Sequence, residues 1–387
     1  MHVAVLGAGY AGVTLTRLLE RRLPADVEIT LVDESPDHLV QHELHRVVRR
    51  PALANEITVS LTDVVDRATV EVATVEGIDR ETRTVDLSSG TLSYDVAVVC
   101  LGAETAFHGL ADVRERATPL KRLAHARQIR REFFDAIETD EPRIVVGGAG
   151  LSGVQVAGEL AELAREEGVA DRTTVTILER LDAVAPGFSP RFQRAVRRSL
   201  ERLGVEIRTG TTVTGADEGA IRVEGGGSIP FDQLVWTGGI RGSDALAGDR
   251  PTVNADLRLD ERTFVCGDAA RVIDDDGETV PASAQSAVRE ARTVAKNVAT
   301  VLERGRPGSE EIEAHLEHFR FRSPGWLVSV GDDAVAKVGP MILTGRAAKA
   351  MKATVGAGYL SSIGGYREAV GLTYAELVAE AVDRPYR

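Results

Sequence analysis

The sequence predicts an α/β protein with two Rossmann-like dinucleotide-binding domains and a C-terminal tail of α+β character. Two observations lead to this prediction. A short apolar run at residues 2–6 stops at the glycine-rich segment GAGYAG, and a helical pattern and a second apolar run follow it. The same order of strand, glycine turn, helix and strand begins again at residue 143, where the glycine segment is GGAGLSG. With 387 residues, the chain is long enough for two or three domains of about 150 residues each.

The first βαβ unit begins at the N-terminus. We expect a strand at residues 2–6, a helix at 13–22 that ends before Pro24, and a strand at 27–32. Three further strands are expected, with Gly90 in a hairpin turn between the last two, at residues 70–76, 83–87 and 95–101. A helix over about 119–138 then leads to Pro142.

The second unit follows Pro142. Its expected strands and helices are strands 143–146, 174–178, 205–209, 221–224 and 233–237 and helices 152–167 and 189–203. A strand at 263–266 then runs into Gly267-Asp268, and a helix at 283–304 ends where glycine and proline break its periodicity. We therefore divide the chain into a first domain in two parts, a second domain and a C-terminal region, at residues 1–112 with 241–305, 113–240 and 306–387.

Composition excludes several classes of protein. Asp and Glu total 59 against 46 Lys and Arg, a net charge of −13 that would repel nucleic-acid phosphate. The two cysteines, Cys100 and Cys266, allow no disulfide framework, and both lie in predicted buried strands where small apolar side chains belong. No apolar stretch reaches the roughly 18 residues of a membrane-spanning helix, and no charged segment precedes the first strand. We expect a protein that is neither secreted nor integral to a membrane.

Three histidines lie close together, at positions 38, 42 and 45. Their spacing without a nearby carboxylate pattern does not define a metal site, so we predict no metal. His42 and His45 are expected to be exposed loop residues.

The glycines of the first motif have separate physical roles. Gly7 permits the tight turn after the strand, Gly9 lets a pyrophosphate approach the backbone, and Gly12 lets helix and strand pack closely. The phosphates would lie at the helix N-terminus, where free N–H groups and the helix dipole favour anions. Asp33, 21 residues beyond Gly12, stands where a carboxylate can accept hydrogen bonds from ribose hydroxyls.

The second motif repeats this arrangement with Gly148, Gly150 and Gly153. Glu179 ends the next strand, 26 residues past Gly153, in the place of the ribose-binding acid. Two such motifs in one chain suggest two different dinucleotides. Glu179 favours NADH because a carboxylate repels the 2′-phosphate of NADPH, whereas the neighbouring Arg180 argues in the opposite direction.

Several further motifs carry a resemblance to a known family. In chain order they include LVDE, DHLVQHELHRV, YDVAVVCLGAET, ILERLDAVAPGFSPRFQRAV, LVWTGGIR, FVCGDAA and PASAQSAVREARTVAKNV. Together with the two glycine motifs, they resemble those of the flavin-dependent pyridine nucleotide oxidoreductases. Within that family the chain is most similar to the type II NADH dehydrogenases, which are single-chain NADH:quinone oxidoreductases. The match runs from residue 1 to about residue 372.

The resemblance implies FAD in the first Rossmann unit and NADH in the second, inserted unit. It implies that Asp268 binds the ribityl or pyrophosphate region of FAD and that Gln41 belongs to a loop on the flavin side. The segment matching Ala284 and Gln285 lines the flavin and the quinone pocket in that family. Gly102, in the segment GAET, is also assigned to cofactor binding by the resemblance.

Two positions depart from the family pattern. The second glycine motif is usually followed by Gly-Val/Ile-Glu, whose glutamate is thought to help in quinone reduction, and this chain has Gln155 there. The second glutamine of the pattern Ala-Gln-x-Ala-x-Gln is Arg289. Glutamine can hydrogen-bond but cannot carry a proton, and arginine brings a fixed charge. Glu159, one helical turn beyond Gln155, is either a substitute for the glutamate or a surface residue. The candidate catalytic residues are Gln285, Gln155 and Glu159.

The tail has a distinctive charge pattern. Residues 334–367 carry no acid and five cations, which are Lys337, Arg346, Lys349, Lys352 and Arg367. Apolar residues recur at every fourth position, at Leu343, Ala347, Met351, Val355 and Tyr359. An apolar face with a basic flank predicts an interfacial helix that binds an anionic membrane surface. Four glycines between residues 356 and 365 weaken this pattern, and packing against the body of the protein or against a homodimer partner is the alternative.

These observations predict an FAD-dependent NADH dehydrogenase. Hydride would pass from NADH to the flavin, and electrons would continue to a membrane quinone. The protein would be cytoplasmic and peripheral on the inner face of the cell membrane. Two alternatives stay open, a soluble flavin-dependent NAD(P)H oxidoreductase with another acceptor and a redox-sensing flavoprotein. The buried cysteines argue against a sulfide:quinone or disulfide reductase, which needs a reactive cysteine pair.

Overall fold

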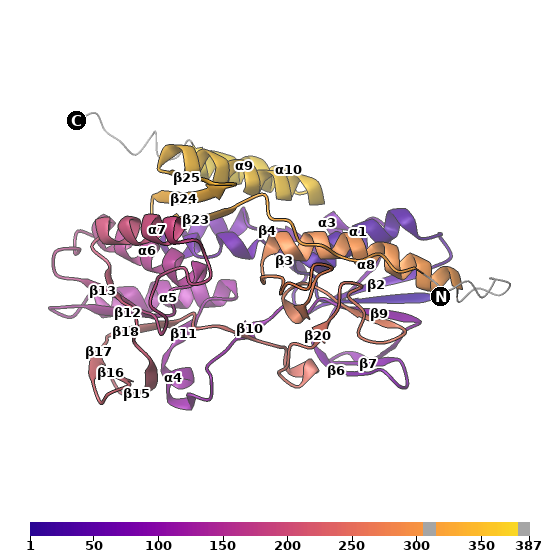
Figure 1. The fold of residues 1–387 in the computed structure, drawn as a ribbon, viewed down its shortest axis with the longest axis horizontal. Helices are drawn as coiled ribbons and strands as arrows, with labels where there is room; N and C mark the ends of the chain where they lie inside the picture. Colours follow the sequence, from indigo (N-terminus) through magenta and orange to yellow (C-terminus); the bar gives the residue numbers. More distant parts are fainter. Residues whose placement is uncertain (305–314, 378–387) are drawn as a thin grey trace.

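The computed structural model describes residues 1–304 and 315–377. Two five-stranded parallel sheets form the cores of two α/β units that lie side by side along the long axis of the molecule (Figure 1). An antiparallel pair, β10 (Glu104–Thr105) and β19 (Ile240–Arg241), connects them. The predicted α/β class with two Rossmann-like units is confirmed.

The first sheet has the order β21-β9-β1-β2-β5, and all its neighbouring strands run parallel. The strands are β1 (His2–Leu6), β2 (Glu28–Asp33), β5 (Thr69–Val72), β9 (Val96–Val99) and β21 (Thr263–Val265). Helices α1 (Tyr10–Arg22) and α8 (Ala284–Arg304) pack against one another beside this sheet. Because β9 and β21 are buried on both faces, they consist almost wholly of apolar residues.

The second sheet has the order β11-β18-β12-β13-β14 and is also parallel. The strands are β11 (Thr118–Pro119), β12 (Arg143–Gly147), β13 (Thr174–Leu178), β14 (Glu206–Arg208) and β18 (Gln233–Trp236). Its helices are α5 (Leu123–Ala136), α6 (Leu151–Glu166) and α7 (Pro190–Arg202). Pro190 occupies the first position of α7. The N–H group at that position has no partner within a helix, so proline is tolerated there and marks where α7 begins.

The C-terminal unit contains an antiparallel sheet and two helices. These are β23 (Trp326–Val330), β24 (Asp333–Val338), β25 (Met341–Thr344), α9 (Arg346–Ile363) and α10 (Tyr366–Leu377). Figure 1 shows α9 and α10 side by side along one edge of the molecule. The sheet packs on α6, and a Cβ at Gly158 would lie 2.5 Å from the Gly331 amide nitrogen in the β23–β24 turn. This close approach requires glycine at position 158.

Short elements complete the chain. The strands are β3 (Asp37–Leu39), β4 (Thr58–Ser60), β6 (Val75–Asp79), β7 (Thr84–Leu87), β8 (Gly90–Ser93), β15 (Val213–Asp217), β16 (Ala220–Val223), β17 (Ser228–Pro230), β20 (Thr252–Val253) and β22 (Arg271–Val272). The helices are α2 (Arg46–Arg49), α3 (Leu61–Val64), α4 (Ala111–Arg116) and the 3₁₀ turns η1 (Gln41–Glu43), η2 (Pro51–Asn55), η3 (Asp244–Leu246) and η4 (Gly267–Ala269).

Two strand predictions were wrong in detail. Residues 70–76 are not one strand, because the chain leaves the parallel sheet after β5 and enters the hairpin sheet with β6. Gly90 does not connect 83–87 with 95–101. It begins an additional strand, β8, which pairs with β7, whereas β9 joins the parallel sheet. The continuous apolar run of β9 does not by itself reveal which sheet this strand enters.

The predicted apolar stripe of the tail is not one helical face. Leu343 lies in β25, where it pairs with Ala336, and α9 begins only at Arg346 after Gly345 with φ of +64°. Lys352 is buried in an ion pair with Glu43, 3.1 Å away, and so does not flank an exposed face. Val355 is exposed. Across the described residues, no helix combines the length and the apolar character needed to cross a membrane.

Candidate dinucleotide and electron-transfer site

In the first glycine turn, two glycines allow close packing within the protein and a third leaves room for a ligand. Gly7 has φ of +101°, and a Cβ there would lie 2.4 Å from the Cys100 carbonyl oxygen. A Cβ at Gly12 would lie 1.8 Å from the Gly7 carbonyl oxygen, so both glycines permit contacts within the protein. A Cβ at Gly9 would meet nothing within 4 Å, because this position opens on a cavity. The turn therefore has the open backbone that a pyrophosphate requires.

Asp33 closes the same turn from the end of β2. Its carboxylate accepts hydrogen bonds from the amides of Ala8, at 2.6 Å, and Ser35, at 2.9 Å. Burial raises the pKa of Asp33, and the two amide hydrogen bonds oppose that shift. Asp33 also lines the cavity, where its carboxylate can meet ribose hydroxyls.

The cavity beside this turn has a volume of about 1550 Å³, more than the roughly 300–1,000 Å³ of ordinary small-ligand pockets. An extended dinucleotide fits such a space. Gly102 lines it with φ of +66°, and Gln41 lines it while its side-chain amide donates to the Lys121 carbonyl oxygen at 3.0 Å. Both predicted residues are therefore at the cavity wall.

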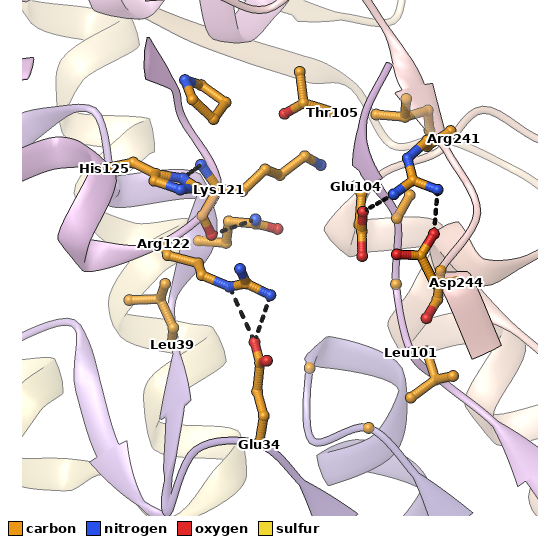
Figure 2. Close-up of a pocket in the computed structure, with 18 of the residues that line it drawn as sticks. Glu34, Leu39, Leu101, Glu104, Thr105, Lys121, Arg122, His125, Arg241 and Asp244 are labelled. Carbon is orange, nitrogen blue, oxygen red and sulfur yellow. Dashed lines mark hydrogen bonds and ion pairs between the residues drawn. The ribbon is translucent and has the colours of Figure 1, made fainter. Parts of the chain in front are cut away.

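Charged side chains from both α/β units meet across the cavity. Arg122, just before α5, contacts Glu34 after β2, with Nη2 2.8 Å from Oε1. On the other side, Arg241 of β19 contacts Glu104 at 2.5 Å and Asp244 at 2.6 Å. Figure 2 shows these two groups facing each other over the open space. The Arg122–Glu34 pair connects the two α/β units on one side of the cavity, and the Arg241 pairs hold the β10–β19 connection on the other.

Asp268 lies in the η4 turn, and Ala284 begins α8. Neither is among the residues that line the cavity, but Asp268 is within electrostatic reach of Tyr10 and Lys121, which do line it. Arg250 holds the turn by donating from Nε to the Asp268 carbonyl oxygen and from Nη2 to that of Ala270, both at 2.7 Å.

Glu290, which the sequence analysis did not identify, lies under the η4 turn. Its carboxylate accepts the Gly267 amide at 2.6 Å from the buried face of α8. Burial raises the pKa of Glu290 to about 7, although the Gly267 hydrogen bond opposes the shift. An acid between Ala287 and Ala291, on the apolar face of a predicted helix, was the signal that could have indicated it.

The second glycine turn has the same geometry. Gly148 has φ of +95°, a Cβ at Gly153 would lie 1.9 Å from the Gly148 carbonyl oxygen, and a Cβ at Gly150 would meet nothing within 4 Å. The Glu179 carboxylate accepts the Ala149 amide at 2.8 Å with one oxygen and the Leu181 amide at 2.8 Å with the other. Both motifs therefore form acid-closed turns, in which the carboxylate at the end of the next strand accepts a backbone amide of the turn. Turns of this kind hold a dinucleotide.

The three candidate catalytic residues do not meet at one point. Gln155 on α6 donates to the Ser329 hydroxyl on β23 at 3.3 Å. Gln285 on α8 donates to the Gly325 carbonyl oxygen at 3.3 Å. Glu159 is not a surface residue, because it is buried in an ion pair with Arg49, whose Nε lies 2.7 Å from Oε2. Burial raises the pKa of Glu159, and Arg49 opposes that shift.

The expectation that His42 and His45 are exposed was wrong. His45 is buried and shares a hydrogen bond with the Ser329 hydroxyl at 2.7 Å, and His42 is half-buried against Tyr10. The reason is tertiary, since α9 and β23 cover this loop. The two cysteines are buried as expected, and their Sγ atoms lie 3.5 Å apart at the ends of β9 and β21.

The model of the family described as pyridine nucleotide-disulphide oxidoreductase matches residues 1–291. The chain belongs to this family. Among curated relatives, the type II NADH:quinone oxidoreductase of Staphylococcus saprophyticus is 28% identical, over 96% of this chain and 97% of that protein. The protein of the same name from Staphylococcus aureus is 27% identical over the same shares. The resemblance inferred from the motifs is confirmed.

Two solved structures share the fold of this chain. NDH2 from Plasmodium falciparum in complex with NADH superposes with a TM-score of 0.83 at 14% identity, covering 97% of this chain and 98% of that one. The sulfide:quinone oxidoreductase from Aquifex aeolicus gives 0.77 at 17% identity, covering all of this chain and 96% of that one. At this level of identity, the likeness supports the family fold, including the C-terminal unit.

Proposed function

We propose that this family member is an FAD-dependent NADH dehydrogenase that reduces quinone. The observation that carries the proposal is the pair of acid-closed glycine turns, each with one glycine that leaves the backbone open to a ligand. The full-length similarity to relatives named type II NADH:quinone oxidoreductase supports quinone as the electron acceptor. The matched family and the NDH2 fold support FAD and NADH as the two dinucleotides.

Each bound group would have its own holding residues. Gly9 and the N-terminus of α1 receive the FAD pyrophosphate, Asp33 accepts its ribose hydroxyls, and Gly7 and Gly12 keep the turn tight. Further contacts are assigned to Gln41, Gly102, Asp268 and Ala284. In the second unit, Gly150 would receive the NADH pyrophosphate and Glu179 would accept hydrogen bonds from its ribose hydroxyls, while Gly148 and Gly153 keep the turn tight. When bound, FAD supplies hydride acceptance from NADH and electron transfer onward.

The quinone headgroup is assigned to the region of Gln285, whose amide is held by the loop before β23. Ser323 donates to its Oε1 at 3.3 Å, and Gln285 Nε2 donates to Gly325. These contacts fix the orientation of the Gln285 amide, and a fixed orientation favours a hydrogen bond to a quinone carbonyl. Gln155, which donates to Ser329, remains a candidate catalytic residue away from Gln285, while Glu159 is paired with Arg49.

An acceptor screen tests the function. Purified holoprotein should be yellow and release FAD on denaturation, and NADH should bleach the flavin in the absence of oxygen. Rapid recolouring by a ubiquinone or menaquinone analogue supports the proposal. Recolouring only by other acceptors favours the soluble oxidoreductase. Flavin that NADH bleaches but no acceptor restores at a useful rate favours the redox-sensing alternative.

The C-terminal unit is assigned to an anionic membrane surface on the inner face of the cell membrane. Val355 on α9 and Val370 on α10 are 58% and 70% exposed, and Arg367 in the first turn of α10 is exposed as well. Exposed apolar groups with neighbouring cations suit a lipid interface. The same residues could instead meet a second copy of the chain, which is the competing outcome of the test.

Vesicle flotation distinguishes these outcomes. Val355→Asp with Val370→Asp should weaken binding to anionic vesicles while NADH-driven flavin reduction is kept. Val72→Asp is the matched control, because Val72 on β5 is 52% exposed but lies in the first α/β unit. Unchanged flotation together with a halved molecular mass in light scattering would replace the membrane with a homodimer.

A further inference from the structure

Tyr10 connects the cavity to a half-buried histidine, His42. Tyr10 lies within the first glycine motif and lines the cavity. Its hydroxyl is 2.5 Å from Nδ1 of His42, and the His42 backbone amide donates to the same oxygen at 3.2 Å. In the tautomer protonated on Nδ1, both His42 groups donate to the Tyr10 oxygen. The Tyr10 hydrogen can then be donated into the cavity.

His42 is the member of this pair that reaches solvent. Its side chain is 33% exposed, and Nε2 lies 3.5 Å from the Glu43 carboxylate. Burial lowers the pKa of His42, Glu43 opposes that shift, and Lys352 on α9 and Arg46 on α2 add to it. Burial also raises the pKa of Tyr10, so this hydroxyl keeps its proton at neutral pH. The imidazole has one nitrogen on Tyr10 and the other beside the Glu43 carboxylate, in a side chain that is one-third exposed, so it can pass a proton between its two nitrogens.

Neighbouring groups lack this combination. His38 is fully buried, with Nδ1 2.8 Å from the Ala8 carbonyl oxygen and Nε2 3.0 Å from the Tyr359 hydroxyl, so both ring nitrogens are engaged inside the protein. Gln155 cannot carry a proton. Glu159 is held by Arg49. Among the groups just named, only the Tyr10–His42 pair has one member that lines the cavity and another that is partly exposed to solvent.

The proposed reaction requires one proton from water. NADH, quinone and one proton give NAD⁺ and quinol. The hydride carries two electrons and one hydrogen nucleus, and the second hydrogen of the quinol must come from solvent. We infer that Tyr10 and His42 form the path for this proton, an inference that rests on the proposed function. The Tyr10 O–H bond breaks as its proton enters the cavity, Nδ1 of His42 returns a proton to the Tyr10 oxygen, and Nε2 takes one from water.

Two variants interrupt the path at its two ends. Tyr10→Phe removes the hydroxyl, and His42→Gln keeps a hydrogen-bonding amide that cannot pass a proton. Anaerobic flavin reduction by NADH needs no solvent proton and should change less than about twofold. Flavin reoxidation by quinone should slow by about 100-fold, the lower end of the range for proton-transfer groups. Added imidazole should restore part of the rate in His42→Ala.

Two further readouts separate proton transfer from a structural effect. The solvent deuterium isotope effect on reoxidation should rise in both variants, and the His42 ring-nitrogen NMR shifts should change on Tyr10→Phe, with bound FAD unchanged by absorbance. Tyr359→Phe is the matched control, because its hydroxyl lies in the same aromatic cluster but contacts His38. It should leave the isotope effect at the wild-type value.

The outcomes separate this inference from the function on which it rests. If the wild-type protein reduces quinone, and both variants do so per bound flavin at the wild-type rate and isotope effect, the proton path is overturned while the function stands. If the wild-type protein reduces no quinone, the proposed function fails first, and unchanged His42 NMR shifts in Tyr10→Phe would overturn the pair itself.

Discussion

The Arg49 guanidinium lies 2.7 Å from the Glu159 carboxylate, and both side chains are almost fully buried. Arg49 belongs to α2 of the first α/β unit and Glu159 to α6 of the second. The same guanidinium contacts Asp332 in the β23–β24 turn at 2.5 Å and Glu166 at 3.2 Å. One side chain thus joins three parts of the molecule.

Removing the Arg49 guanidinium should destabilise the folded protein. Arg49→Ala leaves the buried Glu159 charge unpaired, and the free energy of unfolding should fall by about 3–5 kcal/mol. Denaturant unfolding measures the loss. Arg208→Ala is the control, because its pair with Glu206 is about half exposed and should contribute no more than about 1 kcal/mol. An equal effect of the two substitutions would contradict a structural role for the buried pair.

Alanine substitutions at two glycines of the first motif should have different effects, one on FAD binding and the other on stability. Gly9→Ala adds a methyl group to open space, so the fold should persist while FAD content drops, since the backbone can no longer approach the pyrophosphate. Gly12→Ala places a methyl group 1.8 Å from the Gly7 carbonyl oxygen, so the turn itself must shift and stability should fall by at least about 1–3 kcal/mol. Circular dichroism and flavin absorbance check both. Normal FAD content in Gly9→Ala would be evidence against this turn as the FAD site.

Nucleotide preference should depend on Glu179. Glu179→Gln removes the negative charge at the end of β13 but keeps a side chain that can accept the Ala149 amide. The ratio of kcat/KM for NADH to that for NADPH should fall about tenfold or more, because a charged hydrogen-bond acceptor contributes about 1.5–3 kcal/mol. Arg180→Gln is the comparison. A larger change in that variant would make Arg180 the residue that reads the ribose.

Stability should depend on pH through Glu290. The folded protein keeps the Glu290 proton up to a pKa of about 7, whereas the unfolded chain loses it near the ordinary value of 4.5. Its contribution is therefore complete below pH 4.5 and is lost as the pH rises to about 7, on the order of 3 kcal/mol in all. Glu290→Gln should flatten this decline in denaturant unfolding. Glu261→Gln, at an exposed acid, should keep the wild-type slope.

Local sequence patterns were sufficient for the two nucleotide turns. Gly7 and Gly148 have positive φ, and Asp33 and Glu179 accept the amides of Ala8 and Ala149, each within a single βαβ unit. A strand, a turn and a helix impose their own geometry on such a unit. The acids follow at the end of the next parallel strand, so their position also depends on a local βαβ unit.

Residues that face another unit were not predictable in this way. Glu159, His45 and Lys352 are charged or titratable side chains that a single sequence assigns to the surface, and each is buried against a segment far along the chain. Burying such a group is unfavourable unless a partner compensates it, and the partner is identified only when the chain has folded. Leu343 and Tyr359 show the same limit, because a four-residue repeat does not reveal that a strand ends and a helix begins between them.

The sequence by itself determined that this chain has two dinucleotide turns with their ribose-binding acids, since each depends on contacts within one continuous βαβ unit. Only the tertiary structure decided how those turns are connected. It placed Glu290 under the η4 turn, Arg49 between three units and His42 beside Tyr10. These relationships arise where helices and strands from separate segments pack together, and the free energy of that packing depends on all of the partners at once.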